Sequence, residues 1–251
     1  MATVAARPTN AVHASPSLPG RRYDHLFFSS MAWLMLGAVI VGFGPTYYFA
    51  GVFHAPLPSM IVHVHGAAFT LWMLLLVTQT SLVSAGRVNI HRRLGMGGFV
   101  LAYAMVVLGV LAATDSLVRQ AGPPGRDPKT FYVVPMSAML VFATVITFAY
   151  RNRANSPAHK RLVLIATTAL MVAAFARWPF AFLHRQVVVA TLFSFGFLAM
   201  LILYDLFSLH NIHRATLWAG GFLVFVYELR FPIGRTAAWH AFASWAQNLA
   251  R

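Results

Sequence analysis

Histidines and a few charges inside apolar stretches are the residues of this chain whose types and spacing could do chemistry. The chain has 11 His and no Cys. Disulfides, iron–sulfur clusters and thiol chemistry are therefore excluded, and imidazole is the main remaining soft metal ligand. Ionisable groups inside a membrane are costly, so those that occur there are candidates for function.

The pair His63 and His65 opens the second long apolar run. Residues two positions apart on a helix are rotated by about 200°, so these two side chains cannot share one face. His65 continues at helical spacing through Phe69 and Trp72, and Gly66 beside it allows close approach of a flat group or a second helix. Which of the two histidines faces the bundle stays open at this point.

Arg177 and Glu228 are opposite charges that the sequence places deep in two different apolar runs. Each would cost roughly 2.5–3.5 kcal/mol at the centre of a bilayer if it were left alone. We therefore expect an ion pair between them, with Asp115 and Arg230 as competing partners. The pair would either set the helix register or belong to a site on the outer side.

A second group of candidates lies at the opposite side of the predicted bundle. Three apolar runs begin with a polar residue, then a histidine, then a basic residue; the histidines are His91, His159 and His213. With His210 and Asp205 they would form a metal-binding cluster on the cytoplasmic side. A simpler explanation is helix capping, because the preceding Asn89, Ser156 and Asn211 are residue types that favour N-cap positions.

The composition and the apolar runs indicate which structural elements position these residues. The chain has 251 residues, of which 59% are hydrophobic and 10% are charged, far from the roughly 25% charge of soluble domains. Seven apolar runs follow one another, at about 26–49, 59–84, 94–116, 130–150, 160–182, 187–208 and 214–230. The sequence predicts an all-α integral membrane helical bundle with about seven transmembrane helices of roughly 20 residues each.

The predicted domain organisation is simple. Residues 1–24, rich in Pro, Ala and Ser, are expected to be a disordered tail; residues 25–235 form the transmembrane domain, and residues 236–251 a short C-terminal segment. Most basic residues fall in the tail and in every second link between runs. They are Arg7, Arg21, Arg22, Arg87, Arg92, Arg93, Arg151, Arg153, Lys160, Arg161 and Arg214. The positive-inside rule therefore predicts a cytoplasmic N-terminus.

The net charge of +14 is explained by the same short basic links. No soluble segment carries a basic stripe with interleaved aromatic residues, so nucleic acid is not an expected partner. The expected partners are the anionic headgroups of a bilayer, and the expected location is a bacterial inner membrane.

Three of the basic links carry motifs that permit a comparison with known families. HRRLG from His91, HKRL from His159 and HRATLW from His213 resemble the cytoplasmic signatures of a group of bacterial multi-spanning membrane proteins of uncharacterised function. More distantly, the chain is similar to the cytochrome b561-like and ferric-reductase-like bundles, which hold b-type haem between histidines of neighbouring helices.

The second resemblance implies haem b and particular ligands. His65, or His63, would be an outer axial ligand, with His184 or His54 as its partner. His91 and His159 would form an inner pair. Phe69 and Trp72 would line the flat cavity beside His65. A quinol or a redox partner protein would then exchange electrons with the haem.

Three functions remain compatible with the sequence. The first is a haem-binding electron-transfer protein of the membrane. The second is a non-redox binding, transport or assembly protein with a polar site in the outer leaflet. The third is an intramembrane metal hydrolase, which would need three protein ligands and an open position for water. The sequence does not decide whether the protein is an enzyme.

Overall fold

The computed structural model describes residues 23–56, 58–123 and 125–251, so most of the predicted N-terminal tail lies outside the described residues. Helices are the only regular elements in these ranges. They are α1 (Asp24–Phe43), the short π-helix η2 (Gly44–Tyr48), α2 (Met60–Ser84), α3 (Val88–Val118), α4 (Pro128–Arg151), α5 (Ser156–Phe175), α6 (Val187–Leu209), α7 (Arg214–Gly234) and α8 (Ala237–Leu249).

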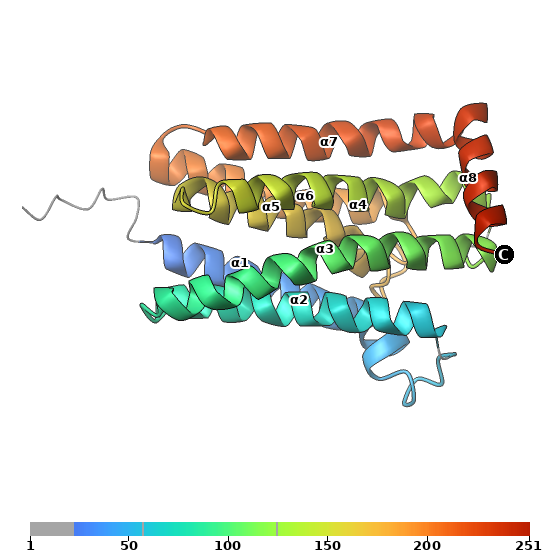
Figure 1. The fold of residues 1–251 in the computed structure, drawn as a ribbon, viewed down its shortest axis with the longest axis horizontal. Coiled ribbons are helices and arrows are strands. Elements are labelled where there is room, and N and C mark those ends of the chain that lie inside the picture. The colour runs from blue at the N-terminus through green and yellow to red at the C-terminus, as the bar shows by residue number, and fades with distance from the viewer. Residues whose placement is uncertain (1–22, 57, 124) are drawn as a thin grey trace, which may run out of the picture.

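Six helices are long and apolar enough to span a membrane, namely α1 with η2, α2, α3, α4, α5 and α6. They lie side by side in a bundle, and α7 runs along them (Figure 1). The sequence predicts about seven spans. The seventh, α7, is not among these six; it carries Arg214, Glu228 and Arg230 and contains Pro232. The structure therefore supports a multi-pass helical membrane protein, in which six helices have the length and apolar composition needed to span a membrane.

The bundle has two ends, which we name by what lies there. At the basic-loop end, the chain turns at residues 85–87, 152–155 and 210–213. At the α8 end, it turns at residues 49–59, 119–127 and 176–186, and α8 lies across the axes of the long helices (Figure 1). Every functional candidate belongs to one of these two ends.

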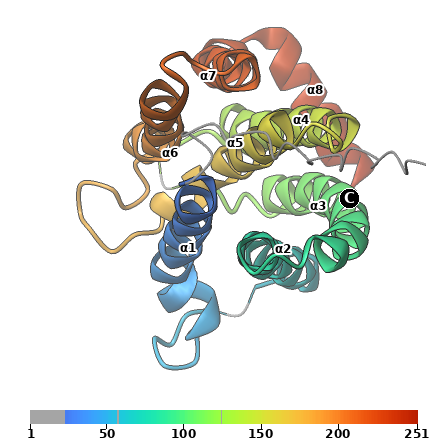
Figure 2. The ribbon, with the colours of Figure 1, turned by 90° about the vertical axis from the view of Figure 1, so that its left-hand side faces the viewer.

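Helix α5 is the centre of the bundle. It contacts α1, α4, α6 and α7, and the end-on view shows it surrounded by them (Figure 2). Its small residues allow this close packing: Ala166, Ala169 and Ala174 are almost completely buried. At Gly42 of α1, an added Cβ would lie within 2.2 Å of the Ala174 carbonyl oxygen. The neighbouring helices can therefore approach α5 closely because their interface residues are small.

The C-terminal segment folds as α8, which is amphipathic. Ala243 and Ala246 pack on α3 and α4, and the Trp239 indole donates a hydrogen bond to the Lys129 carbonyl oxygen at 2.8 Å. Trp245 and Leu249 are exposed on the other side. An amphipathic helix that lies across the ends of membrane-spanning helices suits the membrane–water interface, where tryptophan is favoured.

The observed helix starts differ from the expected N-caps. Helix α3 begins after Arg87, whose side chain makes no cap, so Asn89 lies inside the first turn. The caps of α5 and α7 are Asn155, which accepts from the Ala158 amide, and His213, which accepts from the Ala215 amide. Ser156 and Asn211 therefore do not cap these helices, because a neighbouring residue already supplies the acceptor.

Candidate functional site

A cavity of about 340 Å³ lies inside the bundle, toward the α8 end. All the long helices contribute to its wall, α6 only through Val187. This volume lies within the range of about 300–1,000 Å³ that is usual for small-molecule sites. Most of the wall is apolar, and the Trp72 ring and Tyr227 form part of it. The site is therefore a partly open, mostly apolar cavity with a small number of polar groups.

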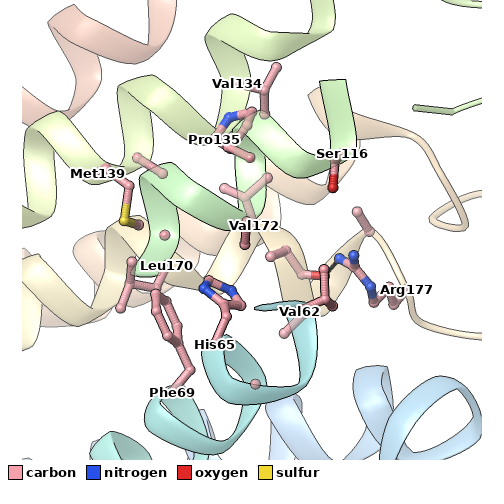
Figure 3. Close-up of a pocket in the computed structure, with 18 of the residues that line it drawn as sticks. Val62, His65, Phe69, Ser116, Val134, Pro135, Met139, Leu170, Val172 and Arg177 are labelled. Carbon is pink, nitrogen blue, oxygen red and sulfur yellow. Dashed lines mark hydrogen bonds between the residues drawn. The ribbon is translucent and has the colours of Figure 1, made fainter. Parts of the chain in front are cut away.

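The polar and apolar groups are separated around the cavity. In the close-up, Arg177 and Ser116 lie to one side of His65, and Phe69, Leu170 and Met139 lie to the other (Figure 3). On the apolar side, Gly109 lets Met139 pack closely against α3, because an added Cβ on Gly109 would lie 2.2 Å from the Met139 sulfur. The cavity thus has one polar wall and one apolar wall.

The structure decides between His63 and His65. His65 points into the cavity (Figure 3), its ring lies against the Phe69 ring with centroids 4.1 Å apart and a tilt of 34° between the planes, and its Nδ1 is buried without a hydrogen-bond partner. His63 is exposed on another face of α2, beside the Tyr47 ring. Only His65 is therefore placed to contact a molecule in the cavity.

Arg177 also lines the cavity, but not in the predicted way. Helix α5 ends at Phe175, so Arg177 lies in the following loop and not within the helix. Its Nη1 donates to the Ala173 carbonyl at 2.7 Å and its guanidinium lies 4.7 Å from the centre of the Phe43 ring. Arg177 is also close enough to His65 for the two groups to interact electrostatically.

The expected ion pair between Arg177 and Glu228 is not formed. Glu228 is exposed on α7, and no ion pair found among the described residues involves it. The two side chains do not meet because they point in different directions: Glu228 is exposed on the outside of the bundle, whereas Arg177 turns toward the cavity. Asp115, a competing partner, binds Arg119 at 2.5 Å and Ser59 at 2.8 Å instead.

Arg230 was expected only as a competing partner in the ion pair of Arg177 and Glu228. It also lines the cavity, with 2% of its surface exposed. Its Nη2 donates to the Thr191 hydroxyl at 2.5 Å, while Nε and Nη1 are buried without a partner. The guanidinium lies over the rings of Tyr227 and Phe231, at 4.4 and 5.0 Å. A signal was present in the sequence, since an arginine inside an apolar run is unusual.

The basic-loop end does not assemble the predicted metal cluster. Asp205 is fully buried and its Oδ1 accepts from Arg161 Nε and Nη2 at 2.8 and 2.5 Å. Its Oδ2 accepts from the Thr216 hydroxyl at 2.6 Å and the His213 amide at 3.1 Å. Both carboxylate oxygens are thus occupied by protein donors, and Asp205 acts as a link between α5, α6 and α7.

The histidines of this end have separate positions. His213 Nδ1 accepts from the Ala215 amide at 3.1 Å, and His210 is exposed at the end of α6 with a left-handed φ of 57°. His91 and His159 do lie near each other, and His159 Nδ1 is 3.0 Å from the Ala149 carbonyl oxygen. Within the described ranges, no group of at least three His, Cys, Asp or Glu is arranged to hold a metal ion.

Haem ligation through two histidines does not fit the cavity. His65 is the one histidine among the described residues that line it. The proposed partners lie elsewhere: His184 is exposed in the loop after α5, and His54 is exposed with its Nδ1 3.2 Å from the Gly51 carbonyl oxygen. A haem with two axial histidines would need the second ring at the depth of His65 on another helix.

Comparisons with models of protein families, with curated proteins and with solved structures found no match. The function is therefore inferred from the residues and the geometry of the site. The cavity can hold a small molecule with an apolar body, and it offers hydrogen-bond donors and positive charge at one wall.

Proposed function

We propose that this protein binds a small amphipathic molecule in the cavity at the α8 end of its bundle. The observation that carries the proposal is the cavity of about 340 Å³, apolar over most of its wall, with Arg177 and His65 facing into it. Enclosed apolar pockets with a few converging polar groups are the usual form of small-molecule sites. The proposal corresponds to the non-redox binding or transport function that the sequence left open.

The proposal includes a bacterial inner membrane as the location, with the basic-loop end in the cytoplasm. Support comes from the basic residues of that end, among them Arg92, Arg93, Arg153 and Arg214. The cavity would then open toward the outer leaflet. A reporter that is active only in the cytoplasm, fused after Arg153, should be active; a silent fusion there would reverse the proposed orientation.

The binding proposal is tested by identifying what the protein carries. The protein is purified in mild detergent, and molecules extracted from it are identified by mass spectrometry; an absorption spectrum is recorded on the same sample. We expect an amphipathic molecule at a fixed ratio to protein and no haem Soret band. A strong Soret band that is lost in His65→Ala would favour the haem-binding function instead.

Two variants of α3 make this experiment specific. Ala112 lines the cavity, so Ala112→Phe should fill part of the space and lower the amount of bound molecule. Ala104 lies eight residues earlier on the same helix and is exposed, so Ala104→Phe should leave the bound amount unchanged. Equal amounts in wild type and both variants would show that the molecule is bulk lipid and would overturn the proposal.

A further inference from the structure

The charges around the cavity are all of one sign. Arg177 and Arg230 line it, and none of the described lining residues is Asp or Glu. Asp115 binds Arg119 and Ser59, and Glu228 is exposed and interacts with Arg230 only electrostatically, without an ion pair. The cavity therefore carries two positive charges and no carboxylate of its own.

Arg230 lacks the partners that a buried guanidinium normally has. The guanidinium has five N–H donors and cannot lose its charge in a protein. In this structure, Arg230 contacts Thr191 and the rings of Tyr227 and Phe231 and interacts electrostatically with Glu228, but Nε and Nη1 have no acceptor. Aromatic faces compensate a buried cation only in part, and a charge left without an opposite partner is strongly unfavourable.

Arg177, the other arginine that lines the cavity, places its guanidinium on the polar wall, on the same side of His65 as Ser116 (Figure 3). Its side chain keeps accessible surface because it borders the cavity. The opposite wall, with Phe69, Leu170 and Met139, offers no charge and suits an apolar chain. A molecule that matches both walls has an oxyanion at one end and a hydrocarbon body at the other.

We infer that the cavity binds an anionic amphiphile, whose carboxylate or phosphate head lies at the arginines and whose apolar chain lies along Phe69 and Met139. This inference rests on the proposed binding function and names its ligand class. Arginine suits such heads because its planar donors match the geometry of carboxylate and phosphate oxygens. His65, between the two walls, adds a buried Nδ1 that has no partner within the protein.

The test compares ligands that differ only in the head. Dodecanoate, dodecyl phosphate and dodecanol share one chain length, and each is titrated in radiolabelled form into the protein reconstituted in phosphatidylcholine nanodiscs at pH 8, with empty nanodiscs subtracted. We expect both anions to bind about tenfold to a hundredfold more tightly than dodecanol, the range that a charged hydrogen bond supplies. Whichever anion binds more tightly identifies the head.

Arginine variants locate the head. Arg177→Gln and Arg230→Gln should each weaken dodecanoate binding about tenfold while dodecanol binding stays the same, and Arg177→Lys should recover part of the loss. Arg235→Gln is the matched control, because Arg235 follows α7 at the same end and is exposed. Arg177 lies in a loop, so its variants test the inference even if Arg230→Gln does not fold.

The outcomes separate the inference from the proposal on which it rests. Equal affinity for dodecanoate, dodecyl phosphate and dodecanol would overturn the anionic head and leave the binding function intact. Absence of saturable binding of any of the three would overturn the binding function itself. Inorganic phosphate, added alone as a competitor, should not displace dodecanoate, because it lacks the chain; full displacement would contradict the amphipathic ligand.

Discussion

Each end of the bundle buries an arginine, but the two guanidinium groups differ in how many of their nitrogens have a hydrogen-bond partner. Arg161 and Arg230 each have 2% of their surface exposed. Arg161 donates from Nε and Nη2 to Asp205, and from Nη1 to the Pro157 carbonyl at 2.8 Å. Arg230 donates from Nη2 to Thr191, and its other two nitrogens have no partner.

The difference extends to the surroundings of each arginine. At the basic-loop end, Asp205 also accepts from Thr216 and from the His213 amide, and Lys160 pairs with Asp24 at 2.5 Å. At the α8 end, neither Arg230 nor Arg177 forms an ion pair among the described residues, and no described residue that lines the cavity is Asp or Glu. The same residue type at the same burial thus serves a closed structural network at one end and an open site at the other. What decides its role is the presence of a protein acceptor.

The largest expected effect is the loss of the carboxylate at the closed end. Asp205→Asn leaves the Arg161 charge buried without its partner, and we expect a loss of about 3–5 kcal/mol in the free energy of unfolding. The measurement is unfolding in SDS–detergent mixtures. The control is Asp127→Asn, because Asp127 is exposed and lies 3.7 Å from His240; it should change the free energy by less than about 1 kcal/mol. Equal losses of stability in Asp205→Asn and Asp127→Asn would contradict the expectation that the buried network around Asp205 stabilises the protein more than an exposed carboxylate does.

A smaller effect is expected at the open end. Arg230→Met removes a buried charge that forms no ion pair among the described residues, and it gives up one hydrogen bond, to Thr191. Without added amphiphile, its free energy of unfolding should lie within about 1 kcal/mol of wild type or above it. Arg161→Met, measured in parallel, should be clearly less stable because Asp205 loses its counter-charge. Similar losses in both variants would contradict the difference between the two ends.

The smallest effect is a pH dependence at the basic-loop end. Burial lowers the pKa of His213, the charges of Arg161 and Lys160 lower it further, and Asp205 opposes the shift. The folded protein therefore binds fewer protons at His213 than the unfolded chain does below about pH 6.5. This contribution to stability is present above pH 6.5 and is lost as the pH falls toward the lower pKa of the folded state.

The variant His213→Asn isolates this contribution, because asparagine can still cap α7 but does not titrate. Between pH 7.5 and pH 5.5, wild type should lose more stability than His213→Asn, by less than about 1 kcal/mol since His213 is only half-buried. A wild-type protein that gained stability relative to the variant at pH 5.5 would show that the carboxylate of Asp205 dominates the environment of His213.

Much of the fold could be predicted from the sequence, because apolar runs report directly on helices in a bilayer. The runs predicted at 59–84 and 187–208 became Met60–Ser84 and Val187–Leu209. Helix ends and the C-terminal segment were predicted less well. The run at 160–182 ends as a helix at Phe175, so Arg177 is a loop residue, and α8 was not predicted although Trp239, Phe242 and Trp245 recur at helical spacing.

The candidate site could be predicted only in part. His65 with Phe69 and Trp72 was identified by helical spacing, and all three line the cavity. The charged partners were not identified correctly: Arg177 with Glu228 was expected, whereas Arg161 with Asp205 is formed. Arg230 was considered as a competing partner of Glu228 and not as a group of the site.

The sequence by itself determined the class of the protein, since length, composition and periodicity of the apolar runs suffice to predict a multi-pass helical bundle. It also determined which ionisable residues are unusual, because any charge in an apolar run is costly. Only the tertiary structure decided which of these charges meet. Arg161 and Asp205 are 44 positions apart and on different helices, so their contact depends on helix rotation and packing. A periodic pattern does not contain that information, because it specifies the face of one helix and not its neighbour.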